Sequence, residues 1–180
     1  MVDAQGRLEQ AAPGRRYRSI VAEAAREVLG LDPARADAVA ATVGDWPPYP
    51  DSSIALARLA GVAPLVALTN SDRDQGVVVR AALGPGVPWA HWLCAEDTGL
   101  YKPDPRVWDA SVAATGVPAG PGWWHVSAYA DYDLDEARRH GLTTVYVERP
   151  HRRPGVATHV VPDLAALADL LTEGLRAPNL

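Results

Sequence analysis

Apolar residues in the first third of the chain recur at helical spacing. Over residues 17–29 they stand three or four positions apart, which puts them on one face of a helix that Gly30 ends. A second helix is expected from Pro33 to about Thr42, because Asp32 can cap it and proline is tolerated in a first helical turn. A third is expected to begin at Ser52.

From about residue 65 onward, short apolar runs alternate with amphipathic segments. The runs predict buried strands over residues 65–68, 89–94, 123–126, 144–147 and 159–161. The amphipathic segments predict helices over residues 75–83, 105–115, 131–140 and 164–173. Strands that alternate with helices at this spacing predict an α/β fold, with a Rossmann-like parallel sheet covered by helices on both faces.

The chain length predicts one domain. A chain of 180 residues can bury a core of ordinary size. We expect an N-terminal helical segment over residues 12–46 and an α/β core over residues 47–178. The proline-rich segment 46–50 is a stiff linker between them.

Composition limits the partners. The net charge of -5 argues against a nucleic-acid or anionic-membrane surface, because both need basic patches. Cys94 is the only cysteine, so neither an internal disulfide nor a cysteine metal site can form. The polar start and the lack of any apolar stretch of transmembrane length predict a cytoplasmic protein.

The ligand site of such a sheet lies beyond the carboxyl ends of its strands. The side chains to consider there are therefore the polar ones that directly follow the apolar runs. They are Thr69, Asn70, Ser71, Glu96, Asp97, Ser127, Tyr129, Glu148 and Arg149.

Several of these residues stand in motifs. The segments in question are Leu68-Thr69-Asn70-Ser71, Tyr101-Lys102-Pro103-Asp104-Pro105, His125-Val126-Ser127 through Asp133, and Val145 to Pro150. In order and spacing they resemble motifs of the haloacid dehalogenase superfamily, and the last resembles its 2-haloacid dehalogenase branch. The resemblance covers about residues 45–175 and implies that the N-terminal helices are a reduced form of the family's helical cap.

The resemblance implies a set of catalytic roles. Lys102 would offset the charge of a nucleophilic aspartate and of its covalent ester. Thr69 and Asn70 would donate hydrogen bonds to the leaving group, while Ser127 and Asp133 would orient the lysine and water. Each residue also has an ordinary alternative: a surface lysine before a helix, turn residues after a strand, or an acidic first helical turn.

The nucleophile suggested by the resemblance is Asp3. The string Asp3-Ala4-Gln5-Gly6-Arg7-Leu8 matches the family's first motif at its aspartate, glycine and leucine, while Arg7 stands in the place of a threonine. Only two residues precede it, so almost the whole first strand is missing. The substrate is expected to lie near Arg7, Tyr129 and Trp108.

Two further substitutions bear on cofactors. Gln5 and Ala128 stand where phosphatases of the superfamily carry aspartates around a magnesium ion, which prefers hard oxygen ligands. The sequence therefore disfavours magnesium and predicts no cofactor.

The missing first strand has a structural consequence. In the family's fold that strand lies between those of the second and fourth motifs, and unpaired buried backbone groups are costly. Either residues before Met1 were lost, the flanking strands pair directly, or another segment or subunit fills the gap. Exposed edges favour self-association, so a homodimer is expected.

Three functions are compatible with these motifs. The leading one is a metal-independent hydrolase of the 2-haloacid dehalogenase type, acting on a small carboxylate-bearing substrate through a covalent aspartyl intermediate. The alternative is a catalytically eroded or repurposed domain with a binding role, which the degenerate first motif supports. Gln5 and Ala128 oppose the third, a phosphatase.

Overall fold

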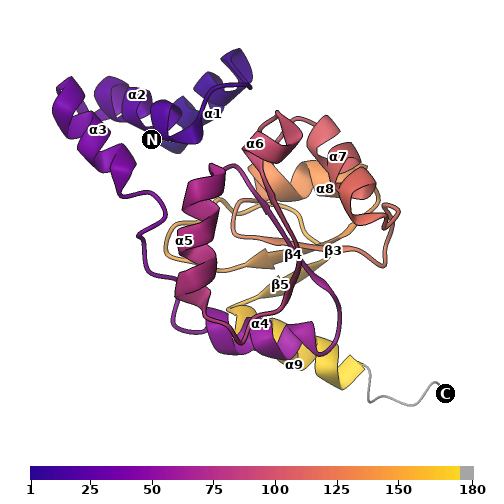
Figure 1. Cartoon of the computed structure of the whole chain (residues 1–180). Helices are drawn as coiled ribbons and strands as arrows, with labels where there is room; N and C mark the ends of the chain where they lie inside the picture. Colours follow the sequence, from indigo (N-terminus) through magenta and orange to yellow (C-terminus); the bar gives the residue numbers. More distant parts are fainter. Residues whose placement is uncertain (175–180) are drawn as a thin grey trace.

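The computed structural model describes residues 1–174. Three helices at the N-terminus, which we call the helical arm, pack against one another beside the α/β part of the chain (Figure 1). They are α1 (Val2–Ala11), α2 (Tyr17–Leu29) and α3 (Pro33–Ala41). Asp32 caps α3 by accepting a hydrogen bond from the Arg35 amide, 3.0 Å long. Small buried side chains such as Ala25 and Ala36 let α2 and α3 pack closely.

The α/β part confirms the predicted α/β class. Its strands are β1 (Leu65–Thr69), β2 (Trp89–Cys94), β3 (Trp124–Ser127), β4 (Thr143–Val147) and β5 (His159–Val161). Its helices are α4 (Ser52–Ala60), α5 (Arg73–Leu83), α6 (Ala95–Thr98), α7 (Arg106–Thr115), the π-helical turn η1 (Ala130–Leu134), α8 (Asp135–Arg139) and α9 (Leu164–Gly174). Each strand lies within about one residue of the run that predicted it, because short apolar runs specify buried strands well. The expected core boundary at residue 178 lies outside the described residues.

Parallel strands with helices on both sides form the core. In Figure 1, α4 and α9 lie on one side of β4 and β5, while α7 and α8 lie on the other. Side chains of a strand alternate between faces. Val145 and Val147 accordingly pack with Leu59 and Leu167, whereas Tyr146 packs with the π-helical turn on the opposite face.

The sheet is divided into two parts. β1 pairs in parallel with β2, and β3, β4 and β5 form a second parallel sheet in that order. Within residues 1–174, β1 and β3 are not paired with each other. Direct pairing of the flanking strands, one of the three expected solutions, is therefore not the one adopted. The homodimer that such edges favour stays a prediction.

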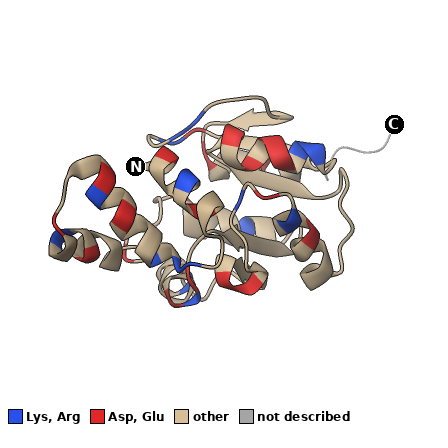
Figure 2. Ribbon diagram, turned by 90° about the horizontal axis from the view of Figure 1, so that it is seen from above, with Lys and Arg blue, Asp and Glu red and all other residues tan. Residues whose placement is uncertain are grey.

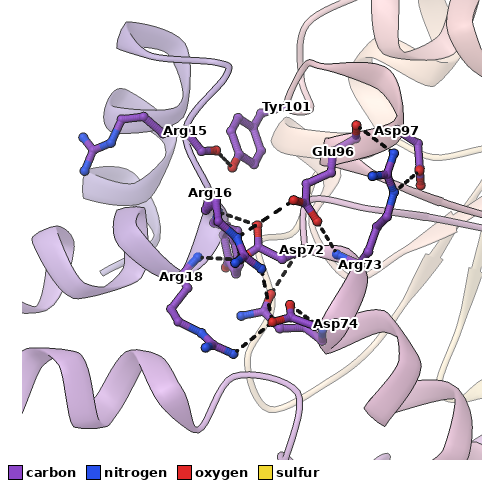
Figure 3. Close-up of polar contacts among 11 residues, drawn as sticks. Arg15, Arg16, Arg18, Asp72, Arg73, Asp74, Glu96, Asp97 and Tyr101 are labelled. Carbon is purple, nitrogen blue, oxygen red and sulfur yellow. Dashed lines mark hydrogen bonds and ion pairs between the residues drawn. The ribbon is translucent and has the colours of Figure 1, made fainter.

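The helical arm is attached to the α/β part through the start of α2 (Figure 3). The buried carboxylate of Asp72 accepts hydrogen bonds from the backbone amides of Tyr17 and Arg18, 2.8 and 3.0 Å long. The Tyr101 hydroxyl donates to the backbone oxygen of Arg15. Although Asp72 precedes α5, its side chain thus serves the N-terminus of a different helix.

The surface carries both signs of charge. Acidic and basic residues are interspersed along the helices in Figure 2. In the part of the chain that the structure describes, no helix has both the length and the apolar character to cross a bilayer.

Candidate functional site

A buried ion pair lies at the centre of the candidate site. Lys102 Nζ is 2.9 Å from Asp133 Oδ1, and the two side chains are 11% and 10% exposed. The Ser127 hydroxyl, at the end of β3, donates to Asp133 Oδ2 over 2.5 Å. The structure therefore brings together three residues, from two separate segments, that the sequence predicted as neighbours.

Electrostatics favour the ionised form of this pair. Burial of Asp133 opposes ionisation, but the Lys102 ammonium and the Ser127 hydrogen bond outweigh it and hold the pKa of Asp133 below its ordinary value. Burial lowers the pKa of the nearby His125 to about 4, so that imidazole is neutral at pH 7. Lys102 is then the cation that balances Asp133.

Asn70 connects the end of β1 to the lysine segment. Its Oδ1 accepts from the Lys102 backbone amide over 2.8 Å, and its Nδ2 donates to the Lys102 carbonyl over 3.1 Å. Beside it, the Thr69 hydroxyl donates to Ser71 Oγ over 3.2 Å. The motif after β1 thus fixes the backbone that carries Lys102.

A carboxylate that sequence reasoning missed also contacts this site. Glu9, on α1, is only 3% exposed, and its Oε2 accepts from Asn70 Nδ2 over 3.3 Å. Burial raises the pKa of Glu9 to about 7, although Asn70 and Lys102 act in the opposite direction. The residue was missed because it stands in a polar N-terminal stretch that no strand pattern places near Lys102.

The prediction for Asp3 was wrong in its placement. Val2–Ala11 forms a helix, so Asp3 lies in a first helical turn instead of at the end of a strand. Its side chain is 84% exposed and pairs with Arg153 over 2.5 Å. A helix forms because this stretch lacks an apolar run that a buried strand would need, and the helical period turns Glu9 inward while Asp3 faces solvent.

Two of the expected substrate contacts also lie elsewhere. Arg7 is exposed and pairs with Glu27 of α2 over 2.5 Å. Trp108 is fully buried in the core, where its ring stacks on His140. Tyr129 remains beside the site, since its amide donates to Ser127 Oγ over 3.1 Å; its role toward a substrate stays a prediction.

The ionisation of Glu9 predicts an unusual pH dependence of stability. The pKa of Glu9 in the folded protein is raised above the ordinary 4.5, so the folded state favours the protonated carboxyl. The stability that protonated Glu9 contributes is therefore fully present at acid pH and is lost as pH rises from about 4.5 to 7. Glu9→Gln should therefore raise the free energy of unfolding at pH 7.5 by about 2–3 kcal/mol and have little effect at pH 4.5. Urea unfolding at both pH values measures this difference.

A matched variant is Glu23→Gln on α2, whose side chain is 45% exposed in a pair with Arg15. It should change stability by less than about 1 kcal/mol at either pH. Equal effects of the two variants at pH 7.5 would show that Glu9 is not held in a desolvated position.

Among residues 1–174, no three or more histidine, cysteine, aspartate or glutamate side chains are grouped so that they could hold an ion. Ala128 directly follows Ser127 at the end of β3 and offers no oxygen ligand from its side chain. The expectation that the protein needs no cofactor stays a prediction.

Comparisons with known proteins bear on the fold and on the family resemblance. No family model matches the chain. Among curated proteins, (S)-2-haloacid dehalogenase 4A of Burkholderia cepacia is 29% identical over 134 residues, which are 71% of this chain and 56% of the relative. The chain therefore spans little more than half the length of that relative.

Solved structures show the same fold. The L-2-haloacid dehalogenase from Xanthobacter autotrophicus superposes with a TM-score of 0.81 at 19% identity, covering 94% of this chain and 83% of that one. The 2-haloacid dehalogenase from Pseudomonas syringae pv. tomato DC3000 gives 0.61 at 20% identity, with 96% and 79% covered. The resemblance that the motifs predicted is confirmed.

Proposed function

Since this chain has the fold of the haloacid dehalogenase superfamily and is similar to its 2-haloacid dehalogenase branch, we propose that it is a metal-independent hydrolase of small carboxylate-bearing substrates. The observation that carries the proposal is the buried Lys102–Asp133 pair, fixed by Ser127 and adjoining Asn70. A buried ammonium group beside an amide donor stabilises negative charge that develops in a transition state.

The proposal needs a carboxylate for attack, and Glu9 is the one in contact with Asn70. One of its oxygens attacks the substrate carbon that bears the halogen. The carbon–oxygen bond forms as the carbon–halogen bond breaks, and the halide leaves with the electron pair. Water then adds to the ester carbonyl and releases the hydroxy acid, the Glu9 carboxylate and a proton. This ester replaces the aspartyl ester that the sequence predicted on Asp3.

A second candidate is a domain that binds a carboxylate without turnover. It is favoured by the position of Asp3, which pairs with Arg153 instead of facing Lys102. It is also favoured by the pKa of Glu9, raised to about 7 by burial, since only about half of that group is ionised at neutral pH.

Chloride release from 2-chloropropionate in the presence of EDTA tests the proposal. Glu9→Gln should lower kcat/KM by at least about 100-fold, because an amide is a poor nucleophile. Asp3→Asn should leave the rate unchanged, and the rate should rise with pH through about 7 as Glu9 ionises.

The other outcomes are equally informative. Loss of activity in Asp3→Asn together with full activity in Glu9→Gln would overturn the assignment of Glu9. Binding of propionate without chloride release from any 2-haloacid would support the second candidate. Phosphate release that depends on magnesium would make the protein a phosphatase and reject both.

A further inference from the structure

A cavity of about 290 Å³ lies between the helical arm, the segment after it and the α/β part. Its apolar wall comes from four segments and consists of Tyr17, Val43, Trp46, Val79 and Trp92. Binding pockets for small molecules are concave, mostly apolar and carry a few fixed polar groups. This cavity has that character and is many times larger than the roughly 30 Å³ that one water molecule occupies.

The polar side of the cavity adjoins the candidate site. It is formed by Thr69, the last residue of β1, and by Asn70 and Ser71, which follow it. Asn70 also bonds the Lys102 backbone and Glu9. One residue therefore borders both the cavity and the charged groups.

Gln75 supplies an independent indication of a ligand. It lines the cavity, is only 2% exposed, and its Oε1 accepts from the Asp72 amide over 2.9 Å. That bond fixes the amide plane, yet Nε2 is buried with no acceptor among the described residues. An unpaired buried donor is costly, so a ligand acceptor that reaches Nε2 would be bound favourably.

We propose that this cavity binds the non-reacting part of the substrate, and that the substrate is an arylalkanoic acid with a hydrogen-bond acceptor on its ring. The inference rests on the proposed function and gives its substrate class. The acid group and the reacting carbon lie at Asn70 and Lys102, the ring lies among the apolar side chains, and its acceptor meets Gln75 Nε2. A two- or three-carbon acid would leave the cavity unfilled.

Calorimetric binding of acids without halogen tests this independently of turnover. 3-(4-Methoxyphenyl)propionate should bind at least about tenfold more tightly than propionate, because its ring is buried and its ether oxygen accepts a hydrogen bond. Val79→Phe fills the cavity and should remove that advantage without weakening propionate binding. Val78→Phe, on the more exposed face of α5, should leave both affinities unchanged.

Two more variants keep the test decisive if Val79→Phe folds poorly. Trp46 is largely exposed, so Trp46→Ala removes part of the wall with little risk to folding and should weaken the aryl ligand alone. Gln75→Glu keeps the oxygen that accepts from Asp72 but turns the donor into an acceptor. It should abolish the preference for the methoxy compound over 3-phenylpropionate.

Chloride release, measured beside ligand binding, distinguishes an error in the assignment of the pocket from an error in the proposed hydrolase function. Tight binding of the aryl acid without chloride release from 2-chloro-3-phenylpropionate would support the pocket and reject the hydrolase. Chloride release from 2-chloropropionate, combined with equal affinities for propionate and the aryl acids, would overturn the pocket and leave the hydrolase. Unchanged aryl binding in both Val79→Phe and Trp46→Ala would also overturn it.

Discussion

Lys102→Met should lower the free energy of unfolding at pH 7 by about 3–5 kcal/mol, because it leaves the buried Asp133 carboxylate without its cation. Methionine keeps most of the volume of the lysine stem, so the loss reports on charge more than on packing. Urea unfolding followed by circular dichroism measures it. The same variant should lose chloride release, since no other ammonium group pairs with Asp133 among the described residues.

The pH dependence of this loss follows from the pKa of Asp133. In the wild type that pKa is lowered despite burial, so the pair stabilises the protein above about pH 4 and ceases to do so as pH falls through the folded pKa. In Lys102→Met burial acts without the ammonium and raises the pKa of Asp133. Protonation of Asp133 then removes the unpaired charge in the variant. The difference in the free energy of unfolding between the variant and the wild type should therefore shrink as pH falls from 7 toward 4.

Two controls identify the buried charge as the cause. Lys102→Met combined with Asp133→Asn removes both charges and should recover most of the lost stability. Arg58→Met breaks an exposed pair with Asp169, 2.6 Å long, and should cost less than about 1 kcal/mol. If the double variant is no more stable than Lys102→Met, the carboxylate is not the source of the loss.

Most of the secondary structure was predictable because the buried faces of helices and strands place apolar residues at regular spacings in the sequence. Strands such as β2 and β5 lie where apolar runs predicted them, and α2 ends at Gly30 in the left-handed conformation, which glycine adopts most easily. The helix over residues 2–11 was missed. Its buried face carries Ala4, Gly6 and Glu9, of which only alanine is apolar, so no hydrophobic period marks it.

The charged part of the site was predictable for a different reason. Lys102 follows β2, whereas Ser127 ends β3 and Asp133 comes after it, and the carboxyl ends of parallel strands meet at one edge. Glu9 comes from a helix outside that pattern, so only tertiary packing brings it to Asn70. The cavity next to Gln75 is likewise formed by segments distant in sequence, and no local motif reports it.

The arm contacts the α/β part through apolar as well as polar side chains, because Ile20 of α2 packs with Ala95 and Tyr101. Gly6 packs against the ring of Tyr132, where an added Cβ atom would lie only 3.2 Å from the nearest ring carbon, and so brings α1 over the residues that follow β3. The arm has its own small core around Val21 and Ala25. The contacts of Asp72 with the start of α2 add a buried polar attachment at the same junction.

Asp72→Asn should lower the free energy of unfolding by about 3–5 kcal/mol. Both carboxylate oxygens of Asp72 accept backbone amides of α2, and the side chain is completely buried. An asparagine can offer only one oxygen and turns an NH₂ group toward the second amide. A hydrogen bond to a charged group contributes about 1.5–3 kcal/mol, and an unpaired buried donor costs about 1–3 kcal/mol more. The favourable charge at the N-terminus of α2 is also lost.

The matched control is Asp74→Asn, which makes the same chemical change two residues later. Asp74 pairs with Arg16 and Arg18 at 3.1 and 3.4 Å, but its side chain is 49% exposed, so its ion pairs contribute less than about 1 kcal/mol (Figure 3). Hydrogen exchange should show faster exchange across residues 2–41 in Asp72→Asn alone, because the arm then loses a buried part of its attachment to the α/β part. Similar exchange and stability in the two variants would mean that surface charge, not the buried cap, holds the arm.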